Sequence, residues 1–214
     1  MEKIKGLPLD CGIAAQTLPG QRESGDKHVI IQSSHGALVA VIDGLGHGED
    51  AAAAARIAAE TLQENDSLSV IPLFRMCHQK LRDTRGVVMS IATFDPIEST
   101  VTWLGVGNVE GVLLHRDSHG TVSQELLSLR GGVVGDRLPN LIASILPVSR
   151  GDTLVFATDG IRNDFVSGMT VGDSVQRTAE NILAHHARGT DDALVLVVRY
   201  SGPQKEAARG WVTD

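Results

Sequence analysis

The sequence predicts an α+β fold, a layered α-β-β-α sandwich of two antiparallel sheets flanked by helices. Short apolar runs of strand length recur along most of the chain, separated by turns rich in glycine, proline and aspartate. Helical periodicity is confined to three stretches, two of which follow each other directly. A parallel sheet would need helices that alternate with strands, so these observations favour antiparallel sheets with helices outside.

The hairpin predicted near the N-terminus brings two aspartates together. A β-branched run at 28–32 and an aliphatic run at 37–42 are separated by a four-residue turn. Asp26 lies just before the first run and Asp43 just after the second. Because the strands of a hairpin are antiparallel, these two carboxylates must lie at the same end of the sheet.

Three helices are predicted at 49–64, 69–82 and 171–187. The first begins with two acidic residues and five alanines, so its first turn suits the positive end of the helix dipole and its small side chains let it lie close to a sheet. The first two helices are consecutive and should form one layer. Strands at 87–94, 100–106, 111–115 and 122–127 are predicted to form an antiparallel meander. The remaining strands are predicted at 11–18, 141–148, 153–157 and 193–198.

Composition limits the kinds of function that are plausible. The formal net charge is −7, with 26 acidic against 19 basic residues, which argues against a nucleic-acid-binding protein and suits cation binding. No apolar stretch is long enough for a signal peptide or a membrane span, so we expect a cytoplasmic protein without membrane contact. The 214 residues, 42% of them hydrophobic, predict a single domain at 1–200 and a loosely ordered C-terminal tail at 201–214. Cys11 and Cys77 have no metal or redox spacing and are predicted to be reduced packing residues.

Four aspartates stand where an apolar strand meets a glycine-rich or polar turn: Asp26, Asp43, Asp159 and Asp191. Any one of them alone could be an ordinary turn or capping residue. As a set they indicate a cation site, because like charges gather only around an ion that offsets their repulsion. Metal ions could activate a water as the nucleophile, so no side-chain nucleophile is needed. This agrees with the absence of a Walker-type lysine loop, Cys-x5-Arg loop, His-Glu-x-x-His or Gly-x-Ser-x-Gly.

These residues resemble the motifs of the metal-dependent serine/threonine protein phosphatases (PPM family), in particular its bacterial SpoIIE-like branch. The matching motifs, in the order and approximate spacing of the family, are Ser24-Gly-Asp26, Val41-Ile-Asp-Gly-Leu-Gly-His-Gly48, Phe156-Ala-Thr-Asp-Gly160 and Asp191-Asp-Ala-Leu. Gly-Val-Gly-Asn at 105–108 and Gly-Gly-Val-Val-Gly at 131–135 look most like the branch member that resets the stressosome.

The resemblance implies a site with Mn²⁺ or Mg²⁺, two ions in all. Asp43 would bridge both ions, the Gly44 carbonyl would help bind one, Asp159 and Asp191 would complete the other, and Asp26 would be an outer or water-mediated ligand. The implied reaction is hydrolysis of phosphoserine or phosphothreonine on a regulatory protein. The implied partner is a phosphorylated STAS-domain protein of a stressosome-like complex.

Two departures from the family pattern leave alternatives open. Gly25 replaces a glutamate of many eukaryotic members, and Leu45 replaces the histidine thought to be their general acid. His47 is the nearest replacement for that acid, although it could equally be a packing residue at a helix start, and Arg22 is the nearest replacement for a phosphate-anchoring arginine. The protein could therefore also be a phosphatase of an anti-anti-sigma factor, or a catalytically weak phosphoprotein-binding module of the same fold.

Overall fold

The computed structural model describes residues 9–33, 36–116, 122–166 and 173–202. Its three helices are α1 (Glu49–Glu64), α2 (Val70–Lys80) and α3 (Val175–His186). Its ten strands are β1 (Leu9–Gln16), β2 (Asp26–Ser33), β3 (Gly36–Gly44), β4 (Val87–Asp95), β5 (Thr100–Val106), β6 (Glu110–Arg116), β7 (Val122–Leu126), β8 (Ser144–Pro147), β9 (Thr153–Ala157) and β10 (Ala193–Tyr200).

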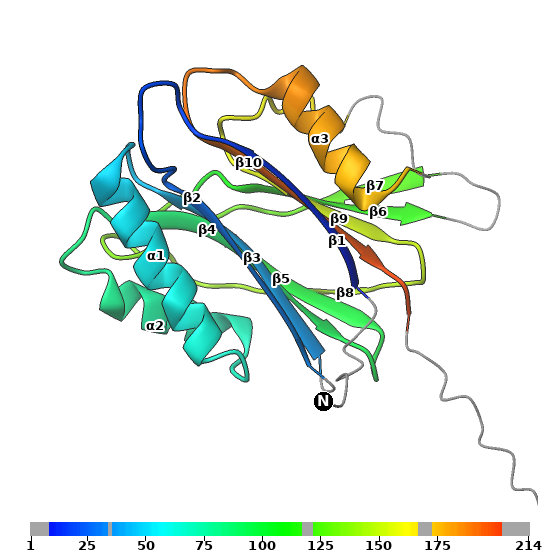
Figure 1. Ribbon diagram of the computed structural model, residues 1–214. Helices are drawn as coiled ribbons and strands as arrows, with labels where there is room; N and C mark the ends of the chain where they lie inside the picture. Colours follow the sequence, from blue (N-terminus) through cyan, green and yellow to red (C-terminus); the bar gives the residue numbers. More distant parts are fainter. Residues whose placement is uncertain (1–8, 34–35, 117–121, 167–172, 203–214) are drawn as a thin grey trace, which may run out of the picture.

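The strands form two five-stranded antiparallel sheets. Sheet A has the order β1-β10-β9-β6-β7, and sheet B has the order β2-β3-β4-β5-β8. The sheets pack face to face, with α1 and α2 on the outer face of sheet B and α3 on the outer face of sheet A (Figure 1). The predicted α+β class and the α-β-β-α layering are confirmed.

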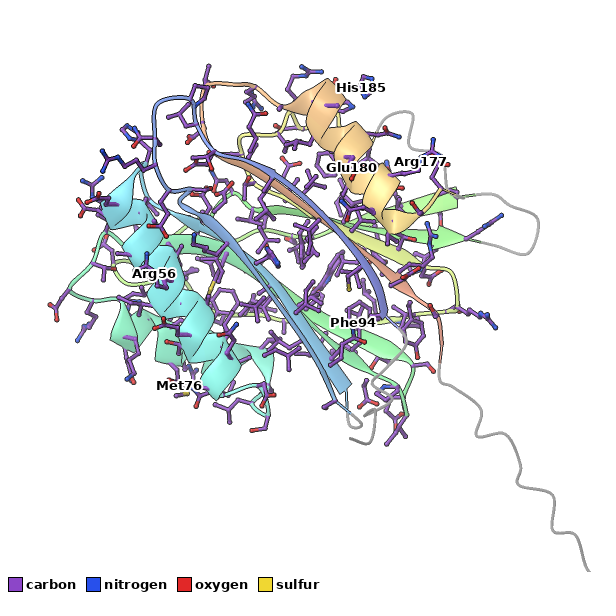
Figure 2. All side chains as sticks on the ribbon, viewed as in Figure 1. Arg56, Met76, Phe94, Arg177, Glu180 and His185 are labelled. Atoms are coloured by element: carbon purple, nitrogen blue, oxygen red, sulfur yellow. The ribbon has the colours of Figure 1, made fainter. Side chains whose placement is uncertain are left out.

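Each pair of layers encloses its own apolar core. Trp103, Phe156 and Phe94 are buried between the two sheets, where the Phe94 ring stacks on that of Tyr200 at 6.0 Å between centroids. The outward faces of the helices are polar: Arg56 on α1 and Arg177, Glu180 and His185 on α3, labelled in Figure 2, are exposed. Alanines fill the sheet-facing side of α1, so the helix lies close to sheet B as predicted.

The predicted meander of four strands from 87 to 127 is wrong. Strands β4 and β5 pair in sheet B, but the chain then crosses to sheet A, where β6 pairs with β7 and β9. Burial explains the crossing, because β6 is apolar on both faces: Leu113 packs between the sheets, while Val112 and Leu114 pack in the core under α3. If β6 instead paired with β5 in sheet B, one of its two apolar faces would be left without a covering layer.

Other predictions agree with the structure to within a few residues. Residues 141–148 do contain a strand, the short β8 at the edge of sheet B. The beginning of the third predicted helix and residues 203–214 of the predicted tail lie outside the described residues, and the single-domain boundary at 200 stays a prediction. Both cysteines are free thiols, Cys77 fully buried and Cys11 partly so. Within the described segments, no helix has both the length and the apolar character needed to cross a membrane.

Candidate metal-dependent active site

The β2–β3 hairpin places Asp26 and Asp43 directly opposite each other. They form the last residue pair of the ladder before the strands separate, and Gly44 N–H donates to the Gly25 carbonyl at 3.1 Å one step further on. Facing residues of an antiparallel pair are about 5 Å apart at their Cβ atoms. The prediction that the hairpin brings these two carboxylates to one end of the sheet is confirmed.

The glycine-rich turn after Asp43 is required by close packing and by backbone conformation. A Cβ atom on Gly44 would overlap the Ala51 carbonyl of α1, so only glycine lets the helix start against the end of β3. Gly46 and Gly48 have φ values of 86° and 78°, a left-handed conformation that glycine adopts without strain. The sequence Gly-Leu-Gly-His-Gly therefore fits a tight strand-to-helix turn beside the Asp43 carboxylate.

Sheet A contributes the other two predicted aspartates at the same end of the molecule. Asp159 follows β9 and Asp191 precedes β10, and these strands are neighbours. Thr158 joins the two sheets, because its hydroxyl donates to Asp26 Oδ2 at 2.8 Å while its backbone N–H donates to the Leu194 carbonyl at 3.1 Å. Carboxylates from both sheets therefore meet at one end of the sandwich.

Electrostatics show how closely the carboxylates gather. Burial raises the pKa of Asp43 to about 9, and repulsion by Asp26, Asp159, Asp191 and Asp192 adds to the shift. Burial raises the pKa of Asp26 to about 7, where the Thr158 hydrogen bond opposes the shift and repulsion by Asp192, Asp159 and Asp191 adds to it. Like charges that raise each other's pKa form a site in which a cation would be stabilised.

Three further residues at this end of the molecule were not identified from the sequence. Asp192, only 4% exposed, accepts from the backbone N–H groups of Leu18 and Gly25, both at 2.7 Å, and so fixes the segment that leads into Asp26. Thr158 holds Asp26 as described, and Asn108 Nδ2 donates to Asp159 Oδ2 at 2.7 Å. All three residues belong to motifs visible in the sequence, namely the Asp191-Asp192 doublet, Thr158-Asp159-Gly160 and the 105–108 motif. Their hydrogen bonds join distant parts of the chain, so the motifs alone do not predict them.

Leu45, which departs from the family pattern, and His47, the candidate replacement for the missing acid, lie in different surroundings. Leu45 packs against the core between the sheets. His47 is exposed, and its Nδ1 lies 3.3 Å from Gln21 Nε2. Arg22 is exposed as well. Burial and repulsion by Asp191 raise the pKa of Asp159, and the positive charge of Arg188 opposes that rise.

The donor set fits a hard divalent cation, although the side chains do not form a ready cage. In the described part of the chain, no group of three or more His, Cys, Asp or Glu side chains is arranged to hold a metal ion. Asp26 is turned toward Thr158 and Asp159 toward Asn108. The available donors are nevertheless carboxylate oxygens with a backbone carbonyl beside them, the ligands that Mg²⁺ and Mn²⁺ prefer.

The family model described as Stage II sporulation protein E (SpoIIE) matches residues 33–201 of the chain. The chain belongs to the SpoIIE family. This family's domain is a PPM-type protein serine/threonine phosphatase, the enzyme class that the motifs predict, and the match to the SpoIIE family covers the motifs built around Asp43, Asp159 and Asp191.

Similar proteins agree with the SpoIIE family and with the PPM-type fold. The phosphoserine phosphatase RsbX of Bacillus subtilis (strain 168) is 22% identical over 184 residues, which are 85% of this chain and 90% of that protein. A crystal structure of RsbX in complex with magnesium has a TM-score of 0.81 at 20% identity and covers 94% of this chain and 98% of the other. A structure described as "The bacterial stressosome: a modular system that has been adapted to control secondary messenger signaling" has a TM-score of 0.80 at 25% identity, covering 89% and 99%.

Proposed function

We propose that this protein uses Mn²⁺ or Mg²⁺, two ions in all, to hydrolyse phosphoserine or phosphothreonine on a regulatory protein. The observation that supports it most strongly is the pairing of Asp26 with Asp43 at the end where sheet A delivers its own aspartates. Asp43 would contact both ions, the Gly44 carbonyl one of them, Asp159 and Asp191 the other, and Asp26 would act through water.

When bound, such cations neutralise phosphate charge and lower the pKa of an attacking water. The protein's own residues supply the framework for that chemistry. Thr158 holds Asp26 in a fixed orientation, and Asp192 fixes the backbone before it. His47 is proposed as the general acid: the Gln21 amide donates to its Nδ1, which leaves the ring proton on Nε2, and the ring is exposed.

The proposed partner is a phosphorylated STAS-domain protein of a stressosome-like complex. Two observations support it: the relative named phosphoserine phosphatase RsbX, and the fold shared with the stressosome structure. The motifs at 105–108 and 131–135, which look most like the branch member that resets the stressosome, support the same partner. A cytoplasmic location stays a prediction that accompanies this proposal.

A catalytically weak phosphoprotein-binding module is the rival that the structure makes worth testing, because Leu45 packs in the core and offers no proton. The test is release of inorganic phosphate from a phosphorylated STAS-domain protein, with manganese and with excess chelator. We expect turnover that depends on the metal and stops in chelator. Tight binding of the phosphoprotein without turnover would favour the module, and full turnover in chelator would contradict the proposed metal site.

Partner recognition can be measured separately. The exposed Asp159 and the partly exposed Asp43 and Asp191 leave the phosphate site open, so the phosphorylated residue alone offers little selectivity. We expect kcat/KM for the folded phosphoprotein to exceed that for a phosphopeptide of the same sequence by at least about tenfold, or roughly 1.4 kcal/mol of binding energy from remote contacts. Equal values for the two substrates would show that the active site alone selects them.

A further inference from the structure

The turn that joins the two sheets ends opposite one of the proposed metal ligands. Strands β6 and β9 are antiparallel, with Glu110 opposite Ala157. Asn108 precedes β6 by two residues and Asp159 follows β9 by two residues, so antiparallel pairing brings both to the same end of these strands. The strand pairing therefore brings the asparagine and the carboxylate together, independently of how either side chain is oriented.

The backbone on both sides of Asn108 is held firmly. Gly107 N–H donates to the Arg130 carbonyl at 2.9 Å, and its φ of 100° and its contact with Val88 leave no room for a side chain. On the other side, the buried Ser90 hydroxyl donates to the Val109 carbonyl at 2.7 Å. Asn108 thus presents its amide from a rigid turn, and that amide donates to Asp159 Oδ2 at 2.7 Å.

We propose that Asn108 is a positioning residue that orients Asp159 and leaves Oδ1 of that carboxylate free for a divalent cation. Asp159 is exposed and is repelled by Asp191, so without a fixed donor its carboxylate would turn toward solvent. A carboxylate that is already oriented loses less rotational freedom when it binds an ion, and such supporting hydrogen bonds typically change metal affinity by about 10- to 100-fold. The inference rests on the proposed function, since it assigns Asp159 to the metal site.

The experiment compares metal binding by the full chain and its variants. Asn108→Ala removes the amide, and Asn108→Leu keeps a side chain of similar size without a donor. Asn181→Ala, an exposed asparagine on α3, is the matched control. The measurements are the Mn²⁺ dissociation constant by calorimetry, the melting temperature in chelator, and kcat at saturating manganese.

We expect both Asn108 variants to raise the Mn²⁺ dissociation constant by at least about tenfold, while kcat at saturating manganese stays within about threefold and the melting temperature in chelator is unchanged. Asn181→Ala should match the wild type in all three measurements. Wild-type affinity in Asn108→Leu, or a lower melting temperature in chelator with unchanged affinity, would make Asn108 a structural turn residue and overturn the proposal. A wild-type protein that binds no Mn²⁺ would overturn the proposed function itself, which separates the two failures.

Discussion

Two buried aspartates in different surroundings show what distinguishes a carboxylate that stabilises the fold from one that we propose lies at a metal site. Asp152 is 3% exposed and Asp26 is 5% exposed. Asp152 accepts from the backbone N–H groups of Ser149 and Arg116, at 2.9 and 3.2 Å, and its Oδ2 also lies 2.9 Å from His115 Nδ1. Asp26 receives one side-chain hydrogen bond, from Thr158, and faces Asp43 instead of a donor.

Burial alone therefore does not identify the site. The difference lies in the balance of donors and charges: around Asp152 donors outnumber carboxylates, whereas around Asp26 and Asp43 the carboxylates outnumber the donors. An excess of negative charge stabilises a bound cation and destabilises the protein without one. The two regions should respond in opposite ways to mutation, metal and pH.

The largest expected effect is on catalysis at the carboxylate cluster, which consists of Asp26, Asp43, Asp159 and Asp191. Asp43→Asn and Asp159→Asn should each lower phosphate release by orders of magnitude, because each removes a proposed negative ligand of the cations. In chelator, Asp43→Asn should melt at or above the wild-type temperature, because the substitution removes a carboxyl group that the neighbouring aspartates repel. Phosphate-release assays and thermal melts check both parts. An Asp43→Asn enzyme with normal turnover would contradict the assignment, and His47→Ala should cost less activity than either.

The opposite result is expected at Asp152. Asp152→Asn places an amide where backbone N–H groups need an acceptor, so it should destabilise the fold by about 3 kcal/mol, within the range for hydrogen bonds to a charged group. Turnover at saturating manganese and moderate temperature should remain close to wild type. Urea unfolding measures the stability change. Loss of activity without loss of stability would show that the two regions are not separate.

Manganese should stabilise the protein through the carboxylate cluster alone. At about a hundred times its dissociation constant, an ion that binds only the folded state adds roughly 2.7 kcal/mol. Thermal melts with and without manganese should show this shift in the wild type and in Asp152→Asn, and a much smaller one in Asp43→Asn. A transition that millimolar manganese leaves unmoved in the wild type would count against a clustered site.

The smallest effect concerns pH in the presence of chelator. The folded pKa values of Asp26 and Asp43, about 7 and about 9, lie above the ordinary aspartate value of 3.8. The folded state therefore binds protons more tightly than the unfolded state, and this contribution to stability is complete below about pH 4 and is lost as the pH rises through 7 and 9. Melting temperatures should fall by a few degrees between pH 6 and pH 8. Asp43→Asn should reduce that slope, and an equal slope in the variant would rule out the cluster as its source.

Much of the site was predictable because it depends on local patterns. An apolar run followed by Asp-Gly predicts a strand that ends in a carboxylate, and the hairpin between 28 and 42 brings Asp26 to Asp43 through a turn of four residues. The first helix was predicted with its observed ends, Glu49 and Glu64, because alanines and acidic residues mark its start clearly. These predictions use contacts within a few residues of each other, where chain geometry leaves few choices.

The sequence by itself determined most strands and helices and the positions of Asp26, Asp43, Asp159 and Asp191 at strand ends, because periodicity and turn chemistry depend on neighbouring residues. Only the tertiary structure decided that β6 leaves the expected meander for sheet A, because its two apolar faces need two cores that distant segments provide. It also decided the roles of Asp192, Thr158 and Asn108, whose partners lie 167, 132 and 51 residues away. No local pattern encodes such contacts, because they arise only when two sheets close against each other and bring their strand ends to one place.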